Sequence, residues 1–367
     1  MCPRPGGTAE AYQNCRYPIL VELRYLSSRR IGGGRAAGTA IMLAVVFPLL
    51  LTHAGRVVYL DSGIVRVGID LERGGSIGYL AASGTPSNNV INCHDMGREV
   101  QLSFYSGPKF YNPPTHQYPN GACDRLFRGQ QWPWNPIGAG DVDGNRGRIL
   151  NVTQTNESAY LLTRPLQWAC HDVPCDCTFE QTFSVATPAG TGVKVDNVLH
   201  TARVDTTEYP PYDQELPAVY SNAPFYRLIT YNGTMPFTAD GIVEYSTGWD
   251  DAAAFPWLPG KFPATESWAA MVNKDGWGVG IVAPISTTFV AGFNGRKGPG
   301  GPEDVSTGYV APTKQVSIPA RGDFKFTFYL VLGDVATIRS FAWQVQGHGL
   351  ADTNVHARDL TSKEHAR

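Results

Sequence analysis

Apolar and polar residues alternate at every second position along several stretches of the chain, which is typical of strands with one buried face. In Ile64–Leu71 the apolar positions alternate with Arg66, Gly68 and Asp70. The clearest case is Phe324–Leu332, where every second residue is Phe or Leu. Further strands are predicted at Ser76–Leu80, Phe179–Val185, Val193–Val195 and Trp277–Ala283. The pattern therefore predicts a protein built mainly from strands.

Helical periodicity is confined to one segment near the C-terminus. Within Asp334–Val345, Asp334 can cap the first turn, and four apolar residues fall on one stripe of the helix. No linker or internal repeat interrupts the strand-rich part. The sequence therefore predicts an all-β fold: one large antiparallel β-sandwich over residues 55–348, with one short C-terminal helix and a polar tail over residues 349–367.

Residues 1–54 have the pattern of a targeting segment. Ala40–Leu51 is an unbroken apolar run of twelve residues, preceded by six arginines against two glutamates. A helix of that length spans roughly 18 Å, which is too short to cross the hydrocarbon core of a membrane. We expect a signal peptide that is cleaved before Gly55, and hence a secreted or cell-surface protein. The alternatives are an uncleaved signal anchor and an organelle transit peptide. The signal anchor is the only expected contact with a membrane.

The composition excludes some classes of partner and leaves others open. Charged residues make up 17% of the chain and its net charge is −2, without a basic run in its main part, so a nucleic-acid partner is not expected. The 40 glycines and 27 prolines indicate many turns. Sequons at Asn151, Asn156 and Asn232 are compatible with glycosylation in a eukaryotic secretory pathway.

Five cysteines follow the targeting segment, and three of them lie close together in WACHDVPCDC. An odd count in an oxidising compartment predicts two disulfides and one free thiol, with the pairing open. Zinc bound by these cysteines and His171 is the weaker alternative, because the spacing lacks a second ligand pair. The segment from Asp141 resembles the start of a calcium loop, but Val152 stands where an EF-hand needs Glu. No metal or other cofactor is predicted.

Two glutamates are the candidates for catalysis. Glu215 precedes a proline and lies among Tyr209, Tyr212 and Tyr220, where loss of solvation would raise its pKa. Glu266 stands between Thr265 and Ser267, next to Trp268. Because glycosidic bonds are usually broken by two carboxyl groups, we predict Glu215 and Glu266 as the catalytic pair. Asp95, Glu180 and Asp213 are kept in reserve, and each glutamate could equally be a surface or loop carboxylate.

Polar and aromatic side chains suited to sugars cluster in two further places. If Arg98–Tyr105 is a strand, Gln101, Ser103 and Tyr105 share one polar face, which is either a sugar-binding face or an ordinary solvated one. Trp132 and Trp134 alternate across a proline and could form a stacking platform. The predicted substrate-binding residues are Arg98, Gln101, Tyr105, Trp132, Trp134, Asn135, Arg164, Trp168, Tyr220 and Trp268. The long aromatic stretches Ser106–Asn145 and Asp205–Asn222 are predicted to be functional loops.

Some of these segments resemble a known superfamily. VRVGIDLERGGSIGYL, which begins at Val65, and the closing FTFYLVLGD resemble the first and last strands of galactose-mutarotase-like β-sandwiches. HDMGREVQLSFYSGP, TRPLQW, QELPAVYSN and ATESWAA resemble blocks of a group of secreted or surface proteins with that fold. The resemblance covers roughly residues 56–340 and implies a carbohydrate as the partner. The chain lacks a clear match to the paired histidines of aldose mutarotases. The fold hosts several chemistries, so the resemblance does not fix a reaction.

We therefore expect a secreted carbohydrate-active enzyme, foremost a glycoside hydrolase acting on a poly- or oligosaccharide. A polysaccharide lyase acting on a uronate-containing glycan is the alternative, with Tyr105, His94, Arg98 and Gln101 available for it. A non-catalytic glycan-binding surface protein is the second alternative.

Overall fold

The structure of the protein is a computed structural model, which describes residues 57–85, 87–107, 123, 132–249 and 257–348. The chain divides into two compact units, Met1–Gly55 and Arg56–Arg367, and the described residues belong to the second. The predicted targeting segment and the predicted polar tail lie outside the described residues. Among the residues that are described, no helix is both long and apolar enough to span a membrane.

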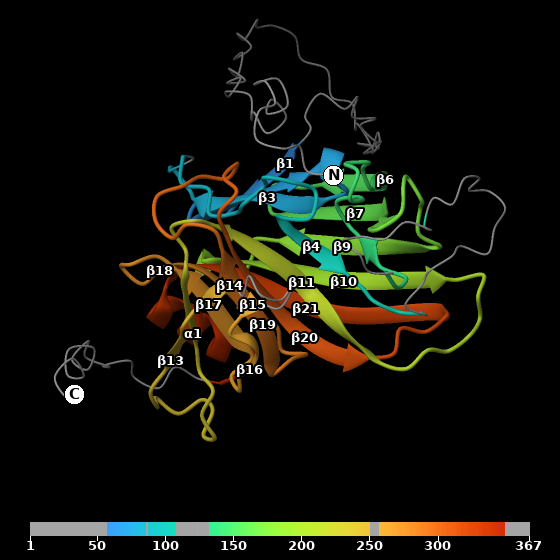
Figure 1. The fold of residues 1–367 in the computed structure, drawn as a ribbon. Helices are drawn as coiled ribbons and strands as arrows, with labels where there is room; N and C mark the ends of the chain where they lie inside the picture. Colours follow the sequence, from blue (N-terminus) through green and yellow to red (C-terminus); the bar gives the residue numbers. More distant parts are fainter. Residues whose placement is uncertain (1–56, 86, 108–122, 124–131, 250–256, 349–367) are drawn as a thin grey trace, which may run out of the picture. The chain divides into compact units, whose positions relative to one another are not determined.

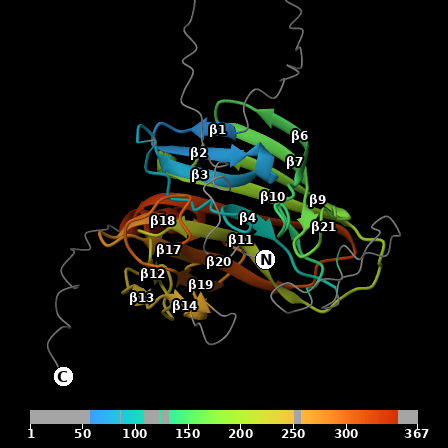
Figure 2. The ribbon, with the colours of Figure 1, turned by 45° about the horizontal axis from the view of Figure 1, so that its top comes forward.

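Two large antiparallel sheets make up the described part of the chain (Figures 1 and 2). The ten-stranded sheet has the order β1 (Val57–Asp61), β2 (Val65–Asp70), β3 (Ser76–Ala82), β4 (Val100–Ser103), β11 (Tyr212–Asn222), β20 (Thr307–Val316), β19 (Thr288–Asn294) and β16 (Gly260–Pro263). Two short strands complete it: β5 (Pro136–Ile137) pairs with β4, and β8 (Leu166–Gln167) pairs with β5.

The nine-stranded sheet has the order β13 (Val243–Tyr245), β12 (Arg227–Thr230), β17 (Trp268–Val272), β18 (Trp277–Val282), β21 (Arg321–Asp334), β10 (Gly192–Ala202), β9 (Cys177–Ser184), β7 (Ser158–Arg164) and β6 (Arg148–Gln154). A separate pair joins β14 (Gly248–Trp249) to β15 (Trp257–Leu258), and two short 3₁₀ turns cover η2 (Leu71–Arg73) and η3 (Pro188–Gly190). The all-β, antiparallel class predicted from the sequence is confirmed.

The main core lies between the inner faces of the two sheets. From the nine-stranded sheet, Phe326, Phe328, Leu330 and Leu332 of β21 point into it, so the alternation read in the sequence is confirmed. From the ten-stranded sheet, β2 contributes Val65, Val67 and Ile69, which were predicted to be apolar positions and are fully buried. The strands predicted at Phe179–Val185, Val193–Val195 and Trp277–Ala283 are also present, as β9, β10 and β18.

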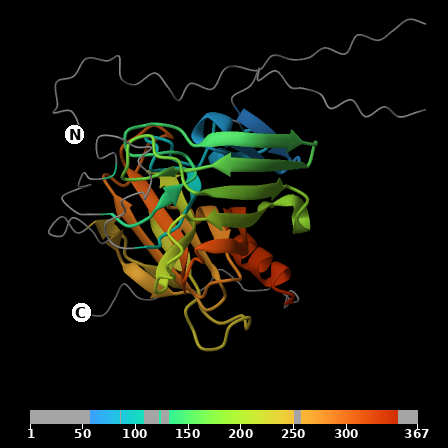
Figure 3. The same cartoon turned by 90° about the vertical axis from the view of Figure 1, so that its right-hand side faces the viewer.

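The predicted C-terminal helix is present as α1 (Val335–Val345), and Asp334 caps it by accepting a hydrogen bond from the backbone N–H of Thr337. The helix packs on the outer face of the nine-stranded sheet, where Ile338 and Phe341 join a second apolar cluster with Trp268 (Figure 3). Gly280 of β18 permits the close approach, because a Cβ atom there would lie 2.3 Å from Ile338.

One predicted loop is instead a central strand. Asp205–Asn222 was expected to be a functional loop, but its second half forms β11, which lies between β4 and β20. The alternation is hidden in the sequence because the register shifts between Glu215 and Val219, where Pro217 interrupts the strand. This shift turns Ala218 and Tyr220 to the face opposite Val219, which belongs to the core.

Two disulfides, Cys123–Cys170 and Cys175–Cys177, and the buried thiol of Cys93 account for all five predicted cysteines. The expected number of disulfides is confirmed, and the cysteines proposed as zinc ligands are used in them.

Candidate functional site

The outer face of the ten-stranded sheet, away from the core, carries the candidate site. Figure 2 shows β4, β11, β20 and β19 side by side. Val100 and Leu102 of β4 point into the core, so Gln101 and Ser103 belong to the outer face. Ser103 pairs directly with Glu215 of β11. The side chains that these neighbouring strands direct outward are therefore brought together.

Glu215 is the central group of this face. The residue is half-buried, and one carboxylate oxygen accepts a hydrogen bond from the hydroxyl of Tyr105 at 3.3 Å. The hydroxyl of Tyr309 on β20 is a second donor. Loss of solvation raises the pKa of Glu215 to about 7, and the two tyrosine hydrogen bonds only partly oppose that rise. At neutral pH this carboxyl group is therefore available both as an acid and as a base.

Three tyrosines and small apolar residues surround the carboxyl group. The rings of Tyr220 and Tyr309 lie 5.0 Å apart, and Ala218 and Ala311 pack against them. Burial raises the pKa of Tyr105 well above 10, and the negative charge of Glu215 adds to the rise. The same two causes act on Tyr309. Both phenols therefore stay protonated at neutral pH and serve as hydrogen-bond donors.

A chain of hydrogen bonds extends from this carboxyl group towards an indole. Ser103 is a hydrogen-bond partner of Tyr105, and its hydroxyl accepts a hydrogen bond from the amide of Asn135 at 3.1 Å. The amide oxygen of Asn135 in turn accepts the indole N–H of Trp132 at 2.9 Å. Tyr105, Asn135 and Trp132, all predicted site residues, thus lie within one network with Glu215.

An ion pair crosses the same face. The ammonium group of Lys261 on β16 lies 2.9 Å from a carboxylate oxygen of Asp213 on β11. Two strands, β19 and β20, lie between them, so three spacings of about 4.8 Å separate the strand axes by roughly 14 Å in a flat sheet. One lysine and one aspartate side chain cannot bridge that distance, so the sheet must curl towards this face.

The predicted partner of Glu215 lies elsewhere. Glu266 is fully buried beside α1, where its two carboxylate oxygens pair with Arg339 at 2.8 and 2.9 Å. It also accepts the indole N–H of Trp268 and the backbone N–H of Phe237, both at 2.9 Å. The four donors leave this carboxylate no role in chemistry on a substrate. The expectation that Glu215 and Glu266 act as a pair is therefore wrong.

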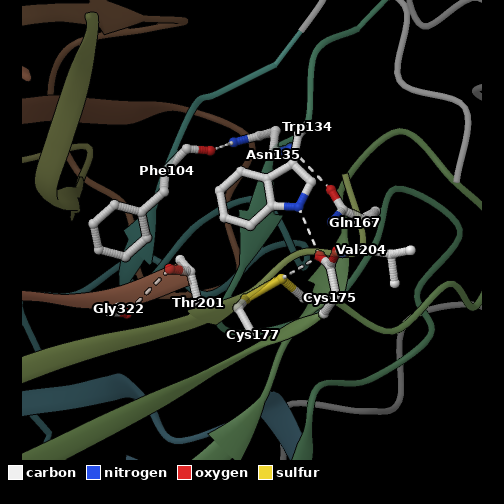
Figure 4. The surroundings of a disulfide bond; sticks show 10 residues. Phe104, Trp134, Asn135, Gln167, Cys175, Cys177, Thr201, Val204 and Gly322 are labelled. Atoms are coloured by element: carbon white, nitrogen blue, oxygen red, sulfur yellow. Dashed lines mark hydrogen bonds between the residues drawn. A yellow bond between two sulfur atoms is a disulfide. The ribbon is translucent and has the colours of Figure 1, made fainter. Parts of the chain in front are cut away.

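Three of the predicted substrate-binding residues are also placed away from the site. Trp134 is fully buried in the main core beside the Cys175–Cys177 disulfide, and its indole N–H donates to Asp176 (Figure 4). Trp268 belongs to the second core beneath α1. Arg164 is exposed on the outer face of the nine-stranded sheet, because the residues that alternate with it along β7 point into the core. These three predictions are corrected.

The polar groups of two further candidates are used within the protein. The amide nitrogen of Gln101 donates to the carbonyl groups of Met96 and Arg98, and its oxygen accepts from the backbone N–H of Ala139. The guanidinium group of Arg98 pairs with Asp95 at 3.2 Å and donates to the carbonyl groups of residues 304 and 305. Both side chains fix the loop that precedes β4.

The remaining candidates keep a partly exposed surface. Trp168 packs its ring edge against Gly97, where a Cβ atom would lie 2.9 Å away, and its backbone N–H donates to the carbonyl group of Asn135. Tyr220 lies against Tyr309, as described above. The role of Trp168 and Tyr220 as substrate contacts stays a prediction.

Sequence reasoning missed Tyr309 and Lys261. The alternation in Thr307–Val316 would have placed Tyr309 on a polar face, but that strand had not been recognised. Among the described residues, no group of three or more His, Cys, Asp or Glu side chains is arranged to hold a metal ion.

Comparison with known proteins finds similar folds and no sequence family. A scan against protein-family models gives no match, and neither does a search of curated proteins. Among solved structures, a galactose mutarotase-like protein from Lactobacillus casei covers 75% of this chain and 99% of its own, with a TM-score of 0.44 and 10% identity.

Two more are a galactose mutarotase related enzyme from Lactobacillus acidophilus, which covers 75% of this chain and 97% of its own (TM-score 0.47, 8% identity), and an aldose epimerase homologue from C. elegans, which covers 76% and 99% (TM-score 0.40, 9% identity). These proteins are of the galactose mutarotase-like kind that the sequence resembles. Identities this low carry no activity over, so the activity of this chain is inferred from its own residues.

Proposed function

We propose that this protein is a carbohydrate-active enzyme that hydrolyses a glycosidic bond, with Glu215 as the general acid. The observation that supports this is the carboxyl group of a half-buried glutamate, whose pKa is raised to about 7 by loss of solvation. With that pKa about half of the molecules still carry the proton at pH 7, which is the state that a leaving sugar oxygen needs.

The surroundings of Glu215 suit a sugar. The half-buried ring of Tyr220 offers an apolar plane for the C–H face of a pyranose, and the buried network of Ser103 and Asn135 holds Tyr105 beside the carboxyl group. The partly exposed Trp132 adds an aromatic surface at the other end of that network. An oligosaccharide bound along the curled face would therefore lie next to the carboxyl group of Glu215.

The lyase alternative has less support. A lyase needs a base that removes a carbon-bound proton, and Tyr105 is a poor base because its pKa lies well above 10. The groups proposed to neutralise a uronate, Arg98 and Gln101, are already bonded within the protein. A purely binding role has no use for a carboxyl group that is costly to leave unsolvated.

A second enzymatic candidate is proton transfer at a free anomeric hydroxyl, which opens and closes the sugar ring. It is favoured by one observation: the hydrogen-bond partners of Glu215 are two phenols and not another carboxylate. Ring opening breaks no glycosidic bond, so its products differ from those of hydrolysis.

We further propose that the protein works outside the cell or at its surface. Two disulfides within one domain support this, because cytosolic proteins rarely keep them.

The test is turnover of a panel of poly- and oligosaccharides by wild type and by Glu215→Gln. We expect wild type to release reducing ends, with a rate that falls as pH rises through about 7, and Glu215→Gln to lose at least about 100-fold in kcat. Glu180→Gln, on the outer face of the other sheet, is the matched control and should keep its rate.

Unsaturated products absorbing in the near ultraviolet would indicate a lyase, and polarimetric change of a monosaccharide without new reducing ends would indicate ring opening. Full activity of Glu215→Gln would overturn the proposal.

A further inference from the structure

We propose that Asp213 is the second catalytic carboxylate and that the enzyme inverts the configuration at the anomeric carbon. This inference rests on the proposed function and adds to it the residue that activates water and the stereochemical outcome. Asp213 and Glu215 are the two acidic residues of β11.

The two carboxyl groups belong to the same face of the strand. Gln214 between them is fully buried and donates to the carbonyl groups of Tyr105 and Tyr212, whereas the side chain of Asp213 is 47% exposed. Residues two apart on a strand point to the same side. Asp213 therefore lies beside Glu215 on the outer face of the ten-stranded sheet.

The spacing of the two Cα atoms along the strand favours the wider carboxyl separation of an inverting enzyme. Two residues of extended chain separate the Cα atoms by about 6.6 Å. Inverting glycosidases keep their carboxyl groups roughly 6.5–9.5 Å apart to leave room for a water molecule, whereas retaining ones need roughly 5–5.5 Å. The two side chains are held apart at their tips, because Glu215 bonds to Tyr105 and Tyr309 while Asp213 bonds to Lys261.

The two environments divide the roles. Glu215 is surrounded by tyrosine rings, so it keeps a proton, and Asp213 is open to water next to an ammonium group. Lys261 is a positioning residue: it reaches across two strands to hold one carboxylate oxygen of Asp213, which leaves the other oxygen for water. The free oxygen of Asp213 can accept a proton from a water molecule.

The reaction balances with these two groups and one water molecule. As the bond between the anomeric carbon and the glycosidic oxygen breaks, the proton of Glu215 passes to that oxygen. A water oxygen attacks the anomeric carbon from the opposite side, and its proton passes to Asp213. Afterwards Glu215 regains a proton from solvent and Asp213 releases one, so the net change is the addition of water with inversion.

The test compares Asp213→Asn and Glu215→Gln on a glycan that wild type hydrolyses and on an aryl glycoside of the same sugar with a good leaving group. We expect Asp213→Asn to lose at least about 100-fold in kcat on both substrates, because both need activated water. Glu215→Gln should lose as much on the glycan but far less on the aryl glycoside, because a good leaving group needs no proton. Proton NMR in the first minutes should show the inverted anomer.

A matched control is available on the other sheet. Lys194 and Asp196 form an ion pair of similar exposure, with 2.7 Å between the charged atoms, so Asp196→Asn should keep full activity. Thermal unfolding shows whether each variant folds. If Glu215→Gln is impaired while Asp213→Asn keeps its rate to within about threefold, or if the first product retains configuration, this inference is overturned and the proposed function stands. If wild type hydrolyses no substrate, or if neither variant is impaired, both are overturned.

Discussion

At the scale of single residues, the candidate site depends on where Glu215 loses its solvation. Its nearest partners are phenols, which donate hydrogen bonds but carry no positive charge to compensate the carboxylate. Glu266 shows the opposite arrangement. Burial alone would raise its pKa, but Arg339 and Trp268 lower it below the usual range. Two glutamates of one chain are thus a proton donor and a structural anion because their partners differ.

The raised pKa of Glu215 predicts a cost in stability. Between its unfolded pKa of about 4.3 and its folded pKa of about 7, the folded state holds a proton that the unfolded state has released. Stability from this group is therefore full below the unfolded pKa and is lost as pH rises through about 7. We expect Glu215→Gln to be more stable than wild type at pH 8 by about 1–3 kcal/mol and nearly equal to it at pH 4.5.

Urea unfolding at the two pH values measures this difference. Glu157→Gln, at an exposed turn, is the control and should change stability equally little at both. A variant at position 215 that is less stable than wild type at pH 8 would contradict the desolvated environment of the glutamate.

At the scale of elements, α1 is fixed to the nine-stranded sheet by one buried ion pair as well as by its apolar stripe. Glu266 is fully buried, and the side chain of Arg339 on α1 is 15% exposed. Removing one partner leaves the other charge buried and unpaired, which typically costs roughly 3–5 kcal/mol. We expect Glu266→Gln to lose about that much stability at pH 7, measured by urea unfolding, with Arg164→Met at an exposed position as the control.

The pH dependence of that loss has a defined sign. Because the folded pKa of Glu266 is lowered, its contribution is present above the unfolded pKa of about 4.3 and fades as pH falls below it. The difference between Glu266→Gln and wild type should therefore shrink in acid. A loss below about 1 kcal/mol at pH 7 would show that this ion pair contributes little to holding the helix on the sheet.

Elements with an unbroken local pattern could be predicted, and those interrupted by irregular pairing could not. The alternation of β21 and the cap at Asp334 are local, so they identified a strand and the helix that follows it. β11 carries Pro217 and a register shift, so its period is broken just where the site lies. Strands of that kind depend on neighbours distant in the chain.

The site, like the fold, could be predicted only where it depends on residues close together in the sequence. Glu215 and Tyr220 were found because their tyrosine-rich surroundings are visible in the sequence, and Tyr105 was found from the alternation in Arg98–Tyr105. Glu266 lay in an equally aromatic stretch, but its partner Arg339 is 73 residues away, and local composition does not reveal it. Trp134 was mistaken for a surface platform because a buried indole and an exposed one have the same sequence context.

At the scale of the whole molecule, the terminal strands of the two sheets are edges at which another chain could pair. β6 is the terminal strand of the nine-stranded sheet; Ile149 and Val152 pack against the core, and its other five residues are exposed. An exposed edge strand offers unpaired backbone groups to another chain. The register shift between Ile149 and Asn151 interrupts that edge and makes regular pairing less favourable.

Leu150, within this shift, is 52% exposed and is the apolar residue that weakens the protection of the edge. A lysine at this position would place a charge on the edge without removing a buried contact, and charged side chains are the usual protection of edge strands. We therefore expect Leu150→Lys to slow aggregation on mild heating while the unfolding midpoint stays within about 1–2 °C of wild type, since surface changes of this kind shift stability by about 0.5 kcal/mol or less. Light scattering during incubation measures the first quantity and calorimetry the second. Ile64→Lys, an exposed apolar position of 50% exposure that lies just before β2, is the control for charge alone. If both variants slow aggregation equally, net charge is the cause, and the edge of β6 has no special part in association.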